Sequence, residues 1–463
     1  MDFGHGLLDS AGRFPLAHGA RRQPMNPPGS AGPSGHGDEP HPGTVQPSGG
    51  VRSPAIPAPG APGTPTSPVP LPLAGPSTRA VHGGEARDKP GHSLTDPIFA
   101  TSTYTFTDTD SIVRFIEEKQ PREEYGRYGN PGERVVEAKL AALEGAEAGL
   151  LFASGMAAFV GILMAHCNAG DEVIFFDECY HRSREFCRRH LTRFGVGFRE
   201  VPSCDYAAME AAITPRTKFL ISESPTNPHL SVVDIPRFAA IGRRHGVLTL
   251  IDATLGTPHN IRPLEGGVDF VLHSATKYLG GHNDLLAGAV LGRHEVIDPV
   301  RQLRGIMGGI NSPHNAYLLE RGLKTFALRM ERHNANGLGV ARFLEAHPRV
   351  ERVLYPGLES HPFHAEARHT MRGYGGLVTF FLGGADWRQT AAVIDRMRVA
   401  RIGPSLGGVE TLIEQPMVMS YWNYSPAERA GFRIADNMIR MACGIEDTAD
   451  LIADLDQALA GPA

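Results

Sequence analysis

Residues 247–254 read VLTLIDAT, and residues 268–275 read VDFVLHSA. Both runs are apolar almost throughout and end in small or polar residues, as strands that are buried on both faces do. Three more runs share this pattern: AGLLFAS (148–154), DEVIFF (171–176) and TKFLISES (217–224). Because turn residues or helical stretches separate these runs, the sequence predicts an α/β fold with a mainly parallel sheet wrapped by helices.

A second, smaller α/β segment is expected beyond residue 330. Its strand candidates are VERVLY (350–355) and GLVTFF (376–381), and a helix is expected from Asp447 to the C-terminal region. In the first segment, ERVVEAKLAALEGAEAG (133–149) has apolar residues at helical spacing. This stretch predicts a helix that ends near its glycines.

Residues 1–78 differ in composition from the rest of the chain. They hold 17 of the 37 prolines and 14 of the 54 glycines, and their only aromatic residues are Phe3 and Phe14. Such a segment buries too little apolar area to offset the entropy of ordering it, so we expect a disordered tail. Its acidic residues, among them Asp2 and Asp9, argue against an acid-poor transit peptide.

Charge and cysteine content exclude several classes of protein. The chain has 463 residues and a formal net charge of −5, without a basic stripe, so we expect no nucleic-acid partner. No run reaches the roughly 18 apolar residues that a membrane span needs, so we expect no membrane partner. The five cysteines are scattered without metal-type spacing, which predicts reduced thiols, no bound metal and a cytoplasmic location.

Residues that can carry chemistry follow the predicted strands. Ligands of α/β folds bind beyond the carboxyl ends of the strands, so these positions are the candidates for a site. They are Ser154-Gly155-Met156, Tyr180, the stretch 224–228 (SPTNP), Asp252 with Thr254, and Ser274-Ala275-Thr276-Lys277. One cofactor, pyridoxal phosphate, suits this combination of a helix start, an aromatic ring, a carboxylate and a lysine flanked by hydroxyls.

The lysine and the helix start have separate tasks in this hypothesis. Lys277 follows an apolar strand, where partial desolvation lowers the pKa of its amine and frees it to hold the cofactor as an imine. Gly155 and Met156 open the helical stretch GMAAFVGILMA and offer backbone N–H groups to a phosphate. Ser274 and Thr276 add hydroxyl groups to the same phosphate site.

Three more residues complete the hypothesis. Asp252 ends an apolar run and would hold the protonated pyridine nitrogen, Tyr180 can stack on the cofactor ring, and Arg440 can bind a substrate carboxylate bidentately. Each also has an ordinary alternative: a helix cap or turn for the aspartate, a core position for the tyrosine and a surface ion pair for the arginine.

From residue 79 to the C-terminus the chain resembles the Cys/Met-metabolism enzymes that use pyridoxal phosphate, the trans-sulfuration enzymes. The stretches that carry the resemblance are EYGRYGNP (124–131), ASGMAA (153–158), ESPTNP (223–228), HSATKYLGGHND (273–284), RGLKT (321–325), YPGL (355–358), SLGG (405–408) and GIED (444–447). Among the branches of the family, it is most similar to plant-type cystathionine γ-synthases, on EYGRYGNP, GGHNDLLAG, Pro404 and QPMVMSYW (415–422).

The resemblance implies a type I pyridoxal-phosphate fold, the fold of aspartate aminotransferase. It implies a tail over 1–78, an N-terminal arm over 79–130, a large cofactor domain over 131–328 and a small C-terminal domain over 329–463. It also implies a homo-oligomer, usually a tetramer of two dimers, in which each active site takes residues from two subunits.

The resemblance assigns roles residue by residue. Lys277 and Tyr180 are the expected catalytic residues. The expected cofactor ligands are Lys277, Asp252, Thr254, Gly155, Met156, Ser274, Thr276 and Tyr180, with Tyr125 and Arg127 reaching the phosphate of the neighbouring subunit's cofactor. The expected substrate ligands are Asn227, Ser405 and Arg440.

Two departures from the family pattern leave the substrate open. Gly132 follows Pro131 where the family usually has threonine, and Ala253-Thr254-Leu255-Gly256 replaces a stretch that often holds phenylalanine. The expected reaction is γ-replacement on an O-activated L-homoserine with a thiol. The alternatives are γ-elimination from a γ-substituted amino acid, including a halogenated one, and a non-catalytic scaffold. A nicotinamide dehydrogenase is excluded because no GxGxxG turn follows the first strand.

Overall fold

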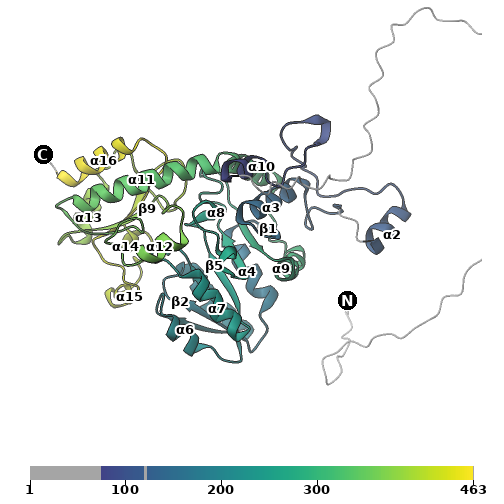
Figure 1. Ribbon diagram of the computed structural model, residues 1–463, viewed down its shortest axis with the longest axis horizontal. Coiled ribbons are helices and arrows are strands. Elements are labelled where there is room, and N and C mark those ends of the chain that lie inside the picture. The colour runs from purple at the N-terminus through teal and green to yellow at the C-terminus, as the bar shows by residue number, and fades with distance from the viewer. Residues whose placement is uncertain (1–74, 119–121, 462–463) are drawn as a thin grey trace, which may run out of the picture. The chain divides into compact units, whose positions relative to one another are not determined.

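The computed structural model describes residues 75–118 and 122–461 (Figure 1). Its larger sheet has seven strands in the order β1-β7-β6-β5-β4-β2-β3. The strands are β1 (Ala148–Phe152), β2 (Glu172–Phe176), β3 (Gly197–Val201), β4 (Thr217–Glu223), β5 (Leu248–Asp252), β6 (Phe270–His273) and β7 (Gly288–Gly292). Only the pairs that involve β7 are antiparallel, so the predicted mainly parallel sheet is confirmed.

The five strand runs expected from the sequence are β1, β2, β4, β5 and β6, but β3 and β7 were not predicted. β3 is an edge strand whose residues GFREV are mostly half-buried or exposed, which removes the apolar signal. β7 is fully buried, yet it begins and ends with glycine. A Cβ at Gly288 would lie 2.1 Å from the carbonyl oxygen of Ser154, so close backbone approach requires this glycine.

Helices cover both faces of the sheet, because side chains of successive strand residues point to opposite sides. In β1, Leu151 packs into one core cluster, whereas Leu150 and Phe152 pack into the other. The first cluster is covered by α3 (Pro131–Glu144), α6 (Tyr206–Ala212), α7 (Ile235–His245) and α10 (Pro313–Lys324). The second is covered by α4 (Gly155–His166), α5 (His181–Arg189) and α9 (His294–Met307).

α3 corresponds to the helix predicted over 133–149. The side chain of Asn130 caps its start by accepting a hydrogen bond from the Gly132 N–H, and Pro131 occupies the first turn. The helix stops at Gly145, whose φ of 78° places it in the left-handed region. Gly149, the second glycine of the predicted end, lies in β1 instead.

The second sheet has five strands in the order β10-β11-β12-β9-β8. They are β8 (Val350–Leu354), β9 (Leu377–Leu382), β10 (Arg401–Ile402), β11 (Leu412–Glu414) and β12 (Met438–Ala442). β8 and β9 are the two predicted strands, and α16 (Thr448–Ala460) is the predicted C-terminal helix. Figure 1 shows α16 and α13 (Trp387–Ile394) gathered near this sheet.

One long helix, α11 (Phe326–Ala346), belongs to both cores. Phe326 and Met330 pack into a core of the larger sheet, whereas Val340 and Leu344 pack into the core of the second sheet. The predicted boundary at residue 328 therefore falls within one continuous helix, and the predicted domain limits stay predictions.

The remaining elements are short. They are α1 (Pro76–His82), α2 (Thr109–Glu118), α8 (Thr257–Asn260), α12 (His364–Thr370), α14 (Pro416–Met419), α15 (Pro426–Gly431) and the 3-10 turns Pro90–His92, Leu191–Phe194 and Pro263–Gly266. Most of the predicted tail, residues 1–74, lies outside the described residues. Among the helices that the structure describes, none combines the length and apolar character that crossing a bilayer requires.

A buried arginine on α11 fixes the loop after β6. Arg329 donates hydrogen bonds to the carbonyl oxygens of Tyr278 (2.7 Å), Leu279 (3.3 Å) and Gly322 (2.8 Å). Burial lowers the pKa of its guanidinium to about 10, so the group is still charged at neutral pH. Two of these bonds satisfy carbonyl groups of the segment that carries Lys277, and the third ties this segment to α10.

We expect Arg329→Met to destabilise the protein by about 3 kcal/mol or more, because it leaves buried carbonyl groups without donors. Urea unfolding followed by circular dichroism measures this change. The exposed Arg342 on the same helix supplies the control, since Arg342→Met should change the free energy of unfolding by less than about 0.5 kcal/mol. Equal effects of the two substitutions would contradict the proposed anchoring.

Candidate active site

A cavity of about 420 Å³ lies where the carboxyl ends of the parallel strands face the second sheet. It is lined by every residue predicted for the site except Tyr125 and Arg127. The predicted residues on its wall are Gly155, Met156, Tyr180, Asn227, Asp252, Thr254, Ser274, Thr276, Lys277, Ser405 and Arg440. Residues far apart in the sequence thus meet at the edge that the strand pattern indicated.

One end of the cavity is formed by the start of α4. Ser154 caps this helix by accepting a hydrogen bond from the Ala157 N–H at 3.1 Å. Within the described residues, the N–H groups of Gly155 and Met156 have no hydrogen-bond partner. A Cβ at Gly155 would lie 2.9 Å from the Cβ of Ser274, so glycine allows the helix start and this hydroxyl side chain to lie together.

Asp252, the last residue of β5, lies half-buried in the cavity wall. Its Oδ1 accepts hydrogen bonds from the backbone N–H of Thr254 at 3.0 Å and from the Thr254 hydroxyl at 2.6 Å. Thr254 in turn accepts a hydrogen bond from the Ser274 N–H at 2.8 Å. Burial raises the pKa of the Asp252 carboxyl, and the hydrogen bonds from Thr254 oppose this rise. A cation placed against it would therefore be held strongly.

Lys277 meets a loop that belongs to the second sheet. Its Nζ donates a hydrogen bond to the Ser405 hydroxyl at 2.6 Å. Burial, together with the nearby charge of Arg440, lowers the pKa of the lysine amine. Ser405 has a φ of 91°, an uncommon backbone conformation for a residue with a side chain. The amine is thus desolvated and held at a defined place in the cavity.

Arg440 on β12 is surrounded by polar partners. It donates hydrogen bonds to the Ser405 carbonyl oxygen at 2.8 Å and to the Asn227 side-chain oxygen at 3.3 Å, and it pairs with Glu414 at 3.1 Å. Burial lowers the pKa of its guanidinium, and Glu414 opposes this. Its Nε is buried without a hydrogen-bond partner in the described part of the chain. This guanidinium can bind a carboxylate.

Tyr180 occupies the N-cap position of α5 and lines the cavity. Its backbone N–H donates to Glu223 at 2.7 Å, and its ring lies beside His181 with a centroid distance of 4.9 Å. Burial raises the pKa of the Tyr180 hydroxyl and raises that of Glu223 well above its ordinary value. The tyrosine is 38% exposed, which leaves its ring free to contact a ligand.

Tyr125 and Arg127 line a second cavity, of about 610 Å³. Arg127 donates hydrogen bonds to the Gly305 carbonyl oxygen and, at 3.1 Å, to the Tyr128 hydroxyl. Glu133 also lines this cavity, and its Oε2 is buried without a hydrogen-bond partner among residues 75–118 and 122–461. Within one chain, these two predicted cofactor ligands therefore do not reach the first cavity.

Comparisons with known proteins agree with this arrangement. The family model of the Cys/Met metabolism PLP-dependent enzymes matches residues 77–460. The chain belongs to this family. It is therefore an enzyme that depends on pyridoxal phosphate, and the predicted type I fold is confirmed.

The individual relatives are named either as γ-synthases or as γ-lyases. The chain is 43% identical to cystathionine gamma-synthase 1, chloroplastic, of Nicotiana tabacum, over 82% of this chain and 71% of that one. It is 40% identical to L-methionine gamma-lyase of Pseudomonas putida, over 84% and 98%. The crystal structure of cystathionine gamma-lyase from Lactobacillus plantarum complexed with L-serine has a TM-score of 0.78 and 36% identity, over 84% and 99%.

The residues of the first cavity fit the cofactor of this family. The free N–H groups of Gly155 and Met156, with the Ser274 hydroxyl, would hold its phosphate. Asp252 has hydrogen bonds only on Oδ1 within the described chain, which leaves Oδ2 for the ring nitrogen. The Lys277 amine, already in the cavity, would hold the aldehyde carbon.

Sequence reasoning missed several residues of this site. Glu414, buried on β11, follows the apolar residues Leu412 and Ile413, so the rule that singled out Asp252 would also have found it. His181 directly follows Tyr180 and lines the cavity. Tyr421 comes from the loop after α14; the stretch QPMVMSYW (415–422) that contains it carried the family resemblance, but no role was assigned to the tyrosine.

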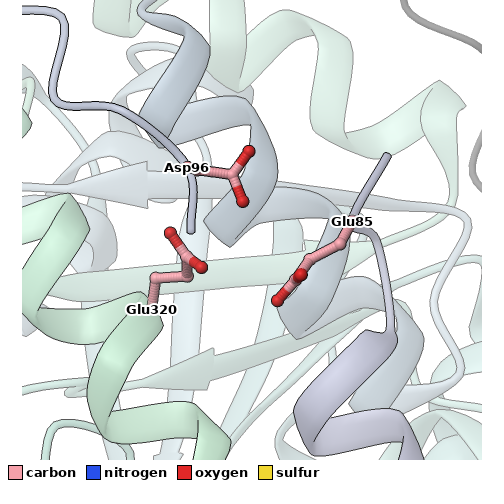
Figure 2. Close-up of side chains that lie close together, drawn as sticks. All are labelled: Glu85, Asp96 and Glu320. Carbon is pink, nitrogen blue, oxygen red and sulfur yellow. The ribbon is translucent and has the colours of Figure 1, made fainter. Parts of the chain in front are cut away.

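Three carboxylates of the structure lie close together outside both cavities: Glu85, Asp96 and Glu320. Figure 2 shows them turned toward one another, with Glu320 on α10. Three lysine ammonium groups lie within 3.3 Å of them: Lys89, Lys139 and Lys324. Burial would raise the pKa of Glu85, but Lys139 and Lys89 outweigh it and bring that pKa to about 2. The cluster is charge-balanced by lysines and needs no cation.

The raised pKa of Glu133 predicts that the free energy of unfolding depends on pH. Burial raises the pKa of its carboxyl to about 7, against the charge of Arg304, whereas the unfolded chain has the ordinary value of 4.5. As pH rises from 4.5 to 7, the unfolded chain releases this proton and the folded chain keeps it, so the folded state loses stability over that window. Glu133→Gln should therefore stabilise the protein by up to about 3 kcal/mol at pH 8 and by much less at pH 5.

Urea unfolding at the two pH values measures this difference. The exposed Glu359 serves as the control, because Glu359→Gln should give no pH-dependent gain. A stabilisation by Glu133→Gln that is the same at pH 5 and pH 8 would contradict the assignment.

Proposed function

We propose that this enzyme catalyses γ-replacement on an O-activated L-homoserine, with a thiol such as L-cysteine as the incoming nucleophile. The observation that carries the proposal is the meeting of Lys277 and Arg440 at Ser405, through hydrogen bonds of 2.6 Å and 2.8 Å. An amine and a carboxylate-binding guanidinium that both contact Ser405 suit an α-amino acid. The name of the tobacco relative supports a synthase.

Pyridoxal phosphate, when bound, supplies an electron sink for the negative charge that develops on the substrate. Lys277 takes the proton from the substrate α-carbon, and its lowered pKa favours the uncharged amine that can accept this proton. Arg440 binds the α-carboxylate, and Asn227 and Glu414 fix the orientation of its guanidinium. Tyr180 shields the opposite face of the site and offers its hydroxyl for proton transfer.

γ-Elimination is the second candidate reaction. Two observations support it. The Pseudomonas relative is named a γ-lyase, and the stretch after Asp252 departs from the family pattern. Leu255, in that stretch, is buried and lines the cavity. Both reactions need the same groups for proton removal and carboxylate binding, and they differ in whether a thiol reaches the γ-carbon. A scaffold without catalysis is set aside, because the family is one of enzymes.

We propose that the active form is at least a dimer. Tyr125 and Arg127 lie on the wall of the second cavity rather than the first, which supports a role in the neighbouring subunit's site. For location we propose the cytoplasm, supported by five cysteines that are all free thiols. Cell fractionation tests the location, and recovery of the protein in an organelle would contradict it.

The reaction is tested by mass spectrometry of products. O-phospho-, O-acetyl- and O-succinyl-L-homoserine are supplied separately, with and without L-cysteine. We expect cystathionine only when cysteine is present, because the thiol completes the replacement. Formation of 2-oxobutanoate regardless of cysteine would establish elimination instead, and absence of both products would contradict the proposed substrate class.

Lys277→Ala tests the role of the lysine. The purified wild-type protein should be yellow, and the variant should lose this visible absorption band and at least about 10³-fold of the activity. Lys324→Ala is a control outside the cavity and should keep the band. A variant that retains both colour and activity would contradict the role of Lys277.

Co-expression of two inactive variants tests the shared site. In a mixed dimer of Lys277→Ala and Arg127→Ala subunits, one site keeps both native residues, so random pairing should restore roughly a quarter of wild-type activity. Lys277→Ala with Asp252→Ala should restore none, because both residues belong to the same subunit's cavity. Equal activities for the two mixtures would contradict the exchange of Arg127 between subunits.

A further inference from the structure

Glu414 on β11 lies beside Arg440 on β12, and both residues line the first cavity. They are direct partners in the register of the two antiparallel strands, so their side chains leave the same face of the second sheet. Their exposed fractions are only 4% and 6%, and Glu414 Oε1 lies 3.1 Å from Arg440 Nη2. Within the described chain, this carboxylate is the charge that neutralises the guanidinium.

One nitrogen of Arg440 makes most of its contacts. Nη2 donates to the Ser405 carbonyl oxygen at 2.8 Å and pairs with Glu414, whereas Nη1 donates to Asn227 at 3.3 Å. A guanidinium binds a carboxylate through two parallel hydrogen bonds, either from Nε and Nη2 or from Nη1 and Nη2. Both pairs include Nη2. A substrate carboxylate that binds Arg440 bidentately therefore has to share this nitrogen with Glu414.

The other titratable groups near this pair do not supply a second free cation. Lys277 is the only other lysine or arginine on the cavity wall within the described residues, and the proposed function engages its amine with the cofactor. The family resemblance assigns Arg127 of a neighbouring subunit to the cofactor phosphate, which would lie at the start of α4. The phenols of Tyr180 and Tyr278 face Arg440, and that of Tyr421 faces Glu414. Burial raises the pKa of all three phenols, so they stay uncharged.

Two carboxylates at one buried guanidinium leave a negative charge without a counter-ion. Burying such a charge is costly, so protonation of one carboxyl group is favoured. Burial already raises the pKa of Glu414, against the charges of Arg440 and Lys277, and a second carboxylate at Nη2 raises it further. The α-carboxyl group of an amino acid is the stronger acid and keeps its charge. Glu223 and Asp252, the other carboxyl groups of the wall, carry no compensating positive charge.

We propose that Glu414 is a positioning residue for Arg440 that takes up a proton from solvent when the substrate α-carboxylate binds the guanidinium. As a carboxylate, Glu414 holds Arg440 in place before the substrate arrives. As a carboxylic acid, it leaves the charge of Arg440 to the substrate. Substrate affinity then falls as pH rises, because the proton becomes harder to take up. This inference rests on the proposed function, which assigns the α-carboxylate to Arg440, and adds proton-coupled binding to it.

The test uses butanoate, a carboxylate without an amino group, which binds Arg440 but does not react with the cofactor. Titration calorimetry of the holoenzyme in two buffers of different ionisation enthalpy gives both its Kd and the proton uptake. For wild-type enzyme, the Kd should rise with pH by up to about tenfold per pH unit, with uptake of up to about one proton per site. Glu414→Gln keeps the shape of the side chain but cannot ionise. Its Kd should vary less with pH and should be about tenfold below that of wild type at about pH 8.

Glu410→Gln is the matched control, because Glu410 is exposed in the loop before β11 and contacts Asn283 instead of the cavity. It should keep the wild-type pH dependence, and the cofactor absorption band should be unchanged in every variant. The same pH dependence and proton uptake in wild type and Glu414→Gln would overturn the inference while leaving the role of Arg440 intact. Equal binding of butanoate by wild type and Arg440→Gln would reject that role in the proposed function, and this inference with it.

Discussion

The hydrogen bonds of Arg329 fix the place of Lys277 and, with it, the geometry of the site. Three carbonyl groups around the loop after β6 converge on one buried guanidinium. The approach is so close that a Cβ at Gly281 would lie 1.9 Å from Arg329, and one at Gly322 would lie 2.4 Å from the Gly280 oxygen. Glycine at both positions is therefore a steric requirement. The amine of Lys277 gains its fixed position from backbone packing beneath it.

The charged side chains of the cavity are oriented by hydrogen bonds and an ion pair with neighbouring residues. Asp252 is held by Thr254, and Arg440 is held by Asn227, Ser405 and Glu414, so each charge has neighbours that orient it. Each also keeps one atom without a hydrogen-bond partner among the residues that the structure describes, Oδ2 of the aspartate and Nε of the arginine. Charged groups that are oriented but not saturated are suited to binding, because a ligand completes their hydrogen bonds without rearrangement.

The sequence predicts well those site residues that directly follow a strand. β4, β5 and β6 are apolar runs with polar residues directly after them, and parallel strands carry these residues to one edge. The stretch 224–228 after β4 already included Asn227, and the family resemblance added its substrate role together with Ser405, which follows no predicted strand. β7 escaped prediction because its flanking glycines serve backbone packing, and β3 because an edge strand alternates poorly. Tyr421 lies in QPMVMSYW (415–422), which carried the resemblance, but its place on the cavity wall depends on tertiary packing and was not predicted.

The contact between Lys277 and Ser405 joins side chains that are 128 residues apart in the sequence, and α11 packs into the core of both sheets. The two sheets are thus not interchangeable modules. A chimera that grafts the C-terminal sheet of a relative onto this chain has to inherit a compatible α11 as well, or the carboxylate-binding arginine would be displaced from the lysine. Recombination between family members is confined to crossover points that leave this helix whole.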